Sequence, residues 1–141
     1  MRMKWSLRLA MITVLFFIPI LLGMGVIGDS PTNKIPVPDK KYTVTFIDQM
    51  DVVTECSEVS IEGNTFVDGK RGEGIYAIAF DRIRIVLFRM KERELRGVVQ
   101  LKDGSEIELV LNKDRKAYGK TEFGTFQIKL SNLKKMIFPT K

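Results

Sequence analysis

The chain from Lys41 onward alternates between apolar and polar side chains in short runs, a pattern that predicts β-strands. Such runs cover residues 42–47, 99–102, 106–111 and 126–130. A period of two puts successive side chains on opposite faces of a strand. Residues that favour turns separate the runs, and the Asp103-Gly104 pair predicts a tight hairpin turn of type I′. We therefore expect a domain of strands with no amphipathic helix longer than two turns.

Two ungapped alignments within the chain indicate an internal repeat. Residues 69–88 align with residues 119–138 at an offset of 50, and residues 44–52 align with residues 99–107 at an offset of 55. The difference predicts about five additional residues in the first copy, accommodated by a bulge or turn near Glu62-Gly63-Asn64. Identical pairs in the longer block are Gly69/Gly119, Lys70/Lys120, Gly74/Gly124, Ile78/Ile128 and Phe88/Phe138.

The repeat units, residues 41–88 and 95–138, each predict strands with one apolar face that a single unit cannot bury. Two units stacked face to face or joined edge to edge bury both faces. We therefore expect an all-β domain over residues 41–141, a small barrel or sandwich built from two degenerate β-repeat units. Its expected core contains the pairs Phe46/Leu101, Phe80/Leu130, Tyr76/Phe126 and Phe88/Phe138.

The stretch TEFGTFQIKLSNLKKMIF, residues 121–138, resembles the T-x-[FY]-G-x-[FIV]-x-I-x-L-x-x-[IL]-K-x-I-x-F element of exported bacterial β domains of unknown function. This resemblance concerns a folding pattern and implies no catalytic residues. The same stretch is similar to the second half of Sm-like small barrels, which would imply RNA binding. The chain lacks the Arg-Gly pairing with Asn or Asp that the Sm-like family uses in its base-binding loops.

The N-terminal segment predicts export or membrane attachment. Residues 1–28 contain basic side chains and no acidic one, and residues 9–22 form an apolar run. A basic start, an apolar stretch and a small-residue end are typical of a signal peptide. Extended to Ile27, the same run is long enough for an N-terminal hydrophobic helix that anchors the chain in a membrane. The third interpretation is a buried core helix, and no Cys follows the run to make a lipoprotein anchor.

Either export or anchoring places the rest of the chain outside the cytoplasm, in the periplasm or cell envelope. Residues 29–40 contain Pro31, Pro36 and Pro38. Proline restricts the backbone to extended conformations, so this segment predicts a semi-rigid linker. The linker would separate the domain from the membrane or from the site of processing.

Composition removes several classes of chemistry. The 141 residues include no His and one Cys, with a formal net charge of +6. These counts exclude His-dependent triads, His-ligated metals, a disulfide framework and Cys clusters. Cys56 is expected to be buried as a small apolar residue. We predict neither a cofactor nor a metal site.

Basic side chains are the candidate binding residues, with low specificity. Arg82, Arg84 and Arg89 belong to a cation-rich stretch, and Lys70 and Arg71 lie in the glycine-rich loop of residues 69–74. On one face they could bind an anionic envelope component. Aromatic residues are not interleaved with these cations, which argues against nucleic acid as a partner. The alternative interpretations, which involve no binding, are a solvated turn for the loop and a short charged linker helix for residues 89–96.

These observations favour a binding or structural module of the cell envelope and not an enzyme. The alternative is a carboxylate-dependent envelope hydrolase that uses Glu106 and Glu108, since paired carboxylates about 5–9 Å apart can cleave glycosidic bonds. A third possibility is an anchor subunit whose exposed edge strand pairs with an envelope protein. The membrane would be a partner only if the N-terminal segment is retained.

Overall fold

A single antiparallel sheet of ten strands makes up the protein over residues 36–140, the part that the computed structural model describes. The strand order is β4-β3-β7-β6-β5-β10-β1-β2-β8-β9, so the predicted all-β class is confirmed. The strands are β1 (Val44–Asp48), β2 (Val53–Ile61), β3 (Phe66–Arg71), β4 (Gly74–Ala79), β5 (Ile83–Lys91), β6 (Glu94–Leu101), β7 (Glu106–Leu111), β8 (Lys116–Thr121), β9 (Gly124–Lys129) and β10 (Leu133–Ile137). Short 3-10 helices η1 (Phe80–Arg82) and η2 (Leu130–Asn132) precede β5 and β10.

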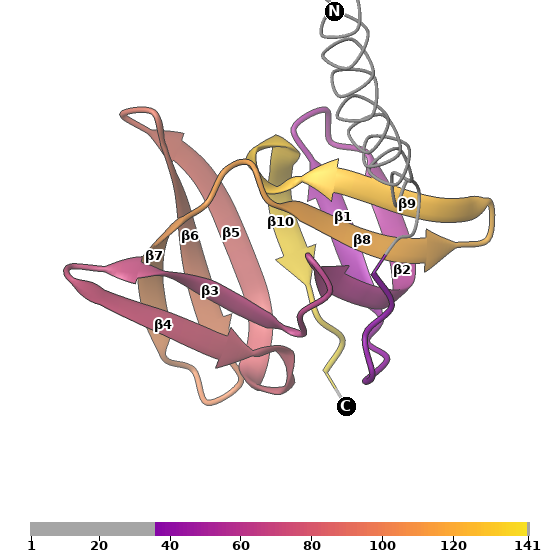
Figure 1. Cartoon of the computed structure of the whole chain (residues 1–141), viewed down its shortest axis with the longest axis horizontal. Coiled ribbons are helices and arrows are strands. Elements are labelled where there is room, and N and C mark those ends of the chain that lie inside the picture. The colour runs from indigo at the N-terminus through magenta and orange to yellow at the C-terminus, as the bar shows by residue number, and fades with distance from the viewer. Residues whose placement is uncertain (1–35, 141) are drawn as a thin grey trace, which may run out of the picture. The chain divides into compact units, whose positions relative to one another are not determined.

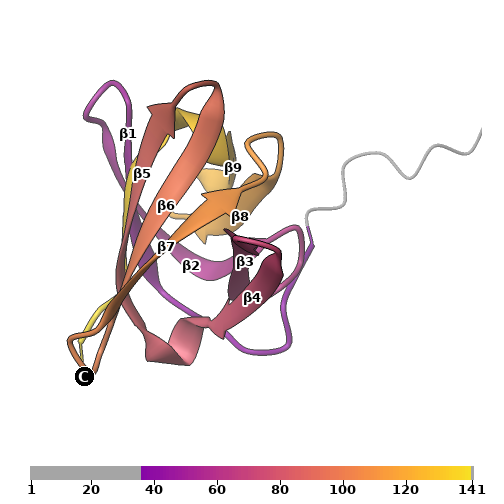
Figure 2. The ribbon, with the colours of Figure 1, turned by 90° about the vertical axis from the view of Figure 1, so that its left-hand side faces the viewer.

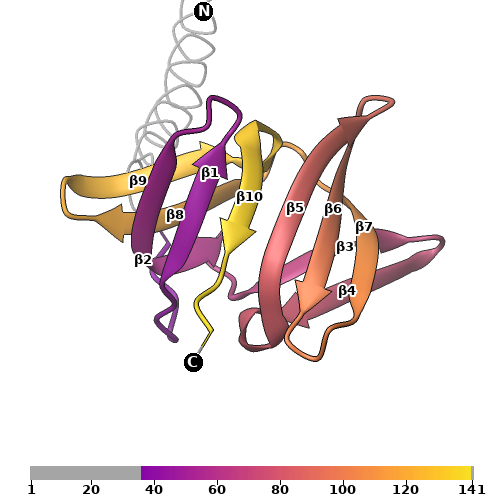
Figure 3. The same ribbon diagram turned by 180° about the vertical axis from the view of Figure 1, so that it is seen from behind.

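The sheet curls at both ends and covers its own inner face. Strands β7, β6, β5, β10, β1 and β2 form one layer, which Figure 3 presents to the viewer. The β3–β4 and β8–β9 hairpins lie on the other side of this layer (Figures 1 and 2). The ladder stays open, with β4 and β9 as its edge strands. The architecture is thus one curled half-barrel, neither a closed barrel nor two separate sheets in a sandwich.

Two stretches of the chain have the same order of elements. The series β3-β4-η1-β5 and β8-β9-η2-β10 have equal start positions at an offset of 50 residues. If each strand is replaced by the strand five places away in chain order, the strand order read from one edge of the sheet becomes the order read from the other edge. At the centre, Val86 on β5 lies opposite Met136 on β10, and these two residues are themselves 50 apart. A pseudo-two-fold axis therefore passes between β5 and β10.

The ladder register corrects the upstream alignment of the two copies. Phe46 lies opposite Met136 and Val99 lies opposite Val86, so Phe46 corresponds to Val99 at an offset of 99 − 46 = 53 and not 55. The first half of the sheet therefore has 53 − 50 = 3 more residues from β2 to β3 than the second half has from β7 to β8, the equivalent strands. One of them lies where β2 shifts register between Ser57 and Ser60, and the other two lie in the turn at Glu62 and Gly63 that follows β2.

The core lies between the layer and the hairpins, and the faces predicted from alternation supply most of it. Predicted core residues Phe46, Phe80 and Leu130 are buried, as are Phe88 and Phe138. Leu101 and Phe126 are partly buried against this cluster. Tyr76 is the exception, because β4 is an edge strand and leaves this side chain 44% exposed.

The end of the predicted linker packs on the domain. Pro38 is buried, and the Lys40 ammonium forms a 3.2 Å ion pair with Asp81. The Tyr42 hydroxyl donates a 2.7 Å hydrogen bond to the same carboxylate. Residues 36–40 thus belong to the folded domain, whereas the predicted leader (1–28) and the start of the linker (29–35) lie outside the described residues.

The predicted charged linker helix at residues 89–96 is a β-hairpin. Strands β5 and β6 pair without interruption from Ile85 to Glu94 across its turn. Arg96 on β6 binds the carboxylates of Glu94 and Glu108 at 3.2 and 3.4 Å. Alternation in the flanking strands outweighs the local helix signal, since it buries Leu95 and Phe88.

The turn of this hairpin offers a stabilising substitution. Glu92 and Arg93 have φ values of 53° and 66°, the left-handed conformation that a type I′ turn requires at both central positions. A side chain there costs about 1–2 kcal/mol per residue. The double variant Glu92→Asn/Arg93→Gly is expected to raise the free energy of unfolding by about 1 kcal/mol in denaturant titrations. Lys102→Gly, in a turn where that residue has no positive φ, should bring no gain.

The turn after β6 differs from its prediction. Only Gly104 has a positive φ, 92°, so the loop is not of type I′. The Gly104 N–H donates to the Leu101 carbonyl at 3.0 Å, and the Leu101 N–H donates to Ser105 at 2.8 Å. Asp51 has the equivalent place in the β1–β2 turn, with φ 62°.

Candidate functional site

A groove lies between the start of β2 and the β8–β9 hairpin. It is open to solvent and has a volume of about 980 Å³. One wall is β2 from Val53 to Ser57, and the other is the hairpin from Lys120 to Phe126. The groove arises because β8 pairs with β2 only from Ser57 onward, so the hairpin diverges from the beginning of β2.

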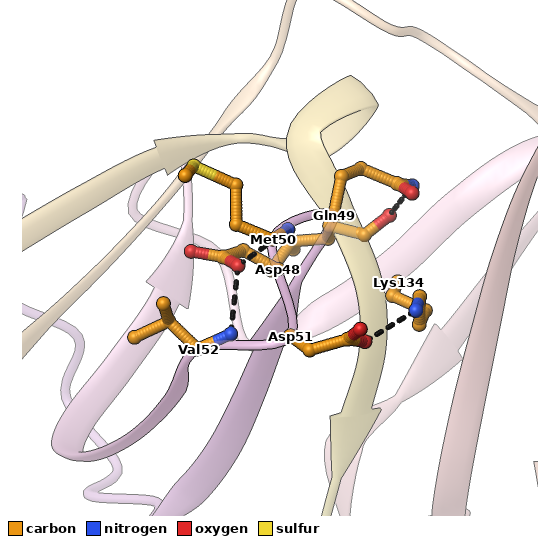
Figure 4. A network of polar contacts seen from close by, with 7 residues as sticks. Asp48, Gln49, Met50, Asp51, Val52 and Lys134 are labelled. Carbon is orange, nitrogen blue, oxygen red and sulfur yellow. Dashed lines mark hydrogen bonds and ion pairs between the residues drawn. The ribbon is translucent and has the colours of Figure 1, made fainter.

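The β1–β2 loop borders the groove and is held rigidly (Figure 4). One Asp48 carboxylate oxygen accepts hydrogen bonds from the Met50 and Val52 N–H groups at 2.9 and 3.0 Å. Gln49 donates from its amide to the Leu133 carbonyl at 2.9 Å, and Asp51 forms an ion pair with Lys134. Both contacts attach the loop to β10. The conformation of the loop is therefore fixed by its polar groups.

The side chains that this frame presents to solvent are apolar. Exposed fractions are 84% for Met50, 53% for Val52, 62% for Val53 and 92% for Phe123, the last at the tip of the β8–β9 hairpin. We call these four residues the apolar rim. Exposed apolar side chains that border a concavity are typical of interaction sites. Because polar bonds hold the loop, the exposure of Met50 and Val52 does not result from a loose segment.

The positions that the symmetry of the strand order relates to the apolar rim all carry polar residues. The offset of 53 pairs Met50 with Asp103, Val52 with Ser105 and Val53 with Glu106, and the offset of 50 pairs Phe123 with Glu73. The same backbone positions thus tolerate charge. The apolar character of the rim is therefore specific to one copy and is not a requirement of the fold.

Cys56 lies at the base of the groove and is buried, as expected from the sequence. Burial raises the pKa of its thiol to about 11. A thiolate is the nucleophilic form of cysteine, so this side chain is unsuited to catalysis near neutral pH.

The Cys56 pKa predicts alkaline destabilisation. The thiol binds its proton more tightly in the native state than in the unfolded chain, where the pKa is about 8.5. Stability is therefore complete below about pH 8.5 and falls as the pH rises towards the native pKa of about 11, by about 1.4 kcal/mol per pH unit. Urea titrations at several pH values should show this fall. Cys56→Ala should remove the contribution of one titrating proton, about 1.4 kcal/mol per pH unit, from the slope of stability against pH. An unchanged slope would contradict the prediction.

Ion pairs flank the far end of the groove. Glu58 lies between Lys120 at 2.9 Å and Lys41 at 3.5 Å. The hydrogen bond and charge of Lys120, followed by those of Lys41, lower the pKa of the Glu58 carboxyl. Within residues 36–140 no ion pair involves Glu55 or Glu122, which also line the groove. The unpaired charge of the groove is therefore negative.

The five basic residues selected from the sequence lie in three places. Lys70 and Arg71 are at the tip of the β3–β4 hairpin, and Arg82 is in η1, at the opposite end of β4. Arg84 and Arg89 are exposed on β5, where Arg84 donates to the Gln100 side chain at 3.1 Å. The fold therefore does not gather these cations into one cluster.

The alternative candidate, Glu106 and Glu108, lies on the outer face of β7. Both side chains are exposed, and Glu108 binds Arg96. Within residues 36–140, no three acidic or Cys side chains converge as metal ligands would. The same range contains no helix of the length and apolar character needed to cross a membrane.

Sequence reasoning did not select the apolar rim. Val52 and Val53 lie outside the runs that predicted strands, and Phe123 stands beside Gly124, the glycine that aligns with Gly74. The signal lies in the unlike positions of the repeat, where Phe123 aligns with Glu73. The pairs at Met50, Val52 and Val53 required the register of the ladder.

Comparison with known proteins gives a family but no activity. A family model described as "Uncharacterised protein" matches residues 38–141. No curated protein and no solved structure matches the chain.

Proposed function

The chain belongs to this family of uncharacterised proteins, and we propose that it is a binding module of the cell envelope that holds a protein partner in the groove of the apolar rim. It is exported or tethered by its N-terminal segment, and it does not act as an enzyme. The observation that carries this proposal is that three exposed apolar side chains, Val52, Val53 and Phe123, line one concavity, with the exposed Met50 on the adjoining loop that Asp48 holds.

The envelope location is supported by the sequence of residues 1–28. Their basic start and apolar run are those of a signal peptide or an N-terminal anchor. Both place the domain where soluble cytoplasmic partners are absent and envelope proteins are abundant. Among the described residues, the charged side chains of the groove without an ion-pair partner are the carboxylates Glu55 and Glu122. They would repel an anionic polymer, so a protein partner suits the groove better.

We further propose that the half-barrel is two degenerate copies of one β-unit. In support, the sheet order is symmetric about the β5–β10 seam. The hairpin of each copy pairs with a strand of the other copy: β3 of the first copy pairs with β7, and β8 of the second copy pairs with β2. The exchange creates two equivalent crossing points, of which one has an apolar rim and the other has charge.

Site-specific photo-crosslinking in the producing cells tests the proposal. A photoreactive residue at position 123 should capture an envelope protein, whereas the same residue at the equivalent position 73 should not. Val53→Glu should abolish the adduct at position 123. Mass spectrometry of the recovered chain identifies its N-terminus: a start near Asp29 indicates a cleaved signal peptide, and a start at Met1 indicates a retained anchor. Equal capture from positions 123 and 73, or capture unaffected by Val53→Glu, would refute a specific groove.

A further inference from the structure

Among residues 36–140, no strand pairs with one edge of β2 in the groove of the apolar rim. β1 pairs with β2 from Val44↔Cys56 to Ile47↔Val53, but on its other side β2 has a partner only from Ser57 onward. In an antiparallel ladder, opposite residues alternate between hydrogen-bonded and non-bonded pairs. The alternation fixes which backbone groups of β2 face the groove.

The hydrogen bond from the Asp48 N–H to the Val52 carbonyl, 3.1 Å, sets this alternation. It makes Thr54 and Cys56 the residues bonded to β1, so the backbone groups of Val53 and Glu55 point away from β1 and into the groove. Ser57, next in the series, lies opposite Lys120 on β8, as the alternation requires. The N–H and C=O groups of Val53 and Glu55 therefore face the groove beyond the point where the pairing of β2 with β8 ends.

Sheets usually protect such an edge with charge. The second repeat does so, because Glu106 and Glu108 lie at the equivalent positions on β7, with Asp103 and Glu73 nearby. On β2 the equivalent of Glu106 is Val53, and Phe123 lies across the groove where Glu73 would be. The edge that is protected in one copy is bordered by apolar side chains in the other.

We propose, on the basis of the proposed binding function, that the groove accepts an extended segment of a partner protein as an additional strand beside β2. The segment bonds to the backbone of Val53 and Glu55 and packs alternate apolar side chains against Phe123 and Val53. It carries a Lys or Arg, because Glu55 and Glu122 are the groove's unpaired charges and Lys120 is occupied by Glu58. This is peptide recognition by strand addition.

A second copy of the chain and a lipid surface fit less well. A symmetric pairing of two β2 edges brings two sets of Glu55 and Glu122 into one interface. An anionic bilayer meets the same carboxylates. A basic, extended peptide complements both the backbone pattern and the charge.

The test is hydrogen exchange of the full chain in mild detergent, with and without a short blocked peptide in which Val alternates with Lys and Thr. The peptide is expected to slow exchange at least tenfold at Val53 and Glu55, whose N–H groups face the groove. The same peptide N-methylated at alternate amides cannot complete the ladder and should give no protection. Val53→Glu and Phe123→Glu should each weaken binding at least tenfold, whereas Ile75→Thr, exposed on β4, should not.

The outcomes separate this inference from the proposed function. Equal binding of both peptides, lost in Phe123→Glu, overturns strand addition but leaves a protein-binding groove. No protection by millimolar peptide also overturns strand addition, while the crosslinking result decides the binding function independently. Slow exchange at Val53 and Glu55 without any peptide would show that the edge is already covered, and it would overturn the inference as well.

Discussion

Phe80→Ala is expected to lower the free energy of unfolding by about 3–5 kcal/mol. Phe80 is buried at the start of η1 and contacts two other rings, Tyr42 at 5.4 Å and Phe138 at 5.1 Å between centroids. Phe80 therefore packs against both the segment that precedes β1 and the segment that follows β10. Removing the ring leaves a cavity between the segments of Tyr42 and Phe138, and their separate attachment to the sheet limits how far the site can collapse.

Chemical denaturation of the variant and of Phe123→Ala measures this effect. Phe123 is almost fully exposed, so its truncation should change stability by less than about 0.5 kcal/mol. Equal losses for the two variants would contradict the assignment of Phe80 to the core. The matched pair also separates stability from binding, because only Phe123→Ala alters the apolar rim.

Gly69→Val is expected to displace the β3–β4 hairpin and to cost at least the 1–3 kcal/mol or so that overpacking typically costs. A Cβ at this position would lie 2.8 Å from Leu109 Cβ and 2.9 Å from the Val110 carbonyl oxygen. The carbonyl cannot move without breaking the β7 ladder. Glycine is required where β3 crosses β7, and Gly119 serves the equivalent crossing of β8 over Cys56.

Gly74→Ala is the control, since its Cβ would find no atom closer than 3.7 Å and the residue has no positive φ. The comparison is made by thermal or urea unfolding of both variants. If Gly69→Val were as stable as Gly74→Ala, the hairpin would not cross β7 as closely as the structure has it. Gly119→Val should repeat the effect of Gly69→Val.

Local alternation predicted the faces of the strands well, because each buried face repeats with a period of two. The pairing of β3 with β7 could not be predicted, since it depends on register between strands about 40 residues apart. For the same reason, aligning Phe46 with Leu101 seemed adequate: a shift of two residues keeps the side chains on the same face. Only the ladder reveals that Phe46 corresponds to Val99.

The candidate site was harder to predict than the fold. The basic residues from Lys70 to Arg89 were selected by sequence proximity, but η1 and the hairpin turn separate them in space. The groove depends on the divergence of β8 from the residues of β2 before Ser57, which no local pattern encodes. Exposed apolar residues such as Val53 resemble ordinary strand residues until their partners are known.

The most direct test of the groove is the number of probe peptides that one chain binds, counted by native mass spectrometry. The native chain should bind one, and Val53→Glu/Phe123→Glu should bind none. Transferring the apolar rim to the second repeat by Asp103→Met, Ser105→Val, Glu106→Val and Glu73→Phe should raise the number to two. If the native chain, the double variant and the transferred variant all bound the same number, the apolar rim would not be the binding site.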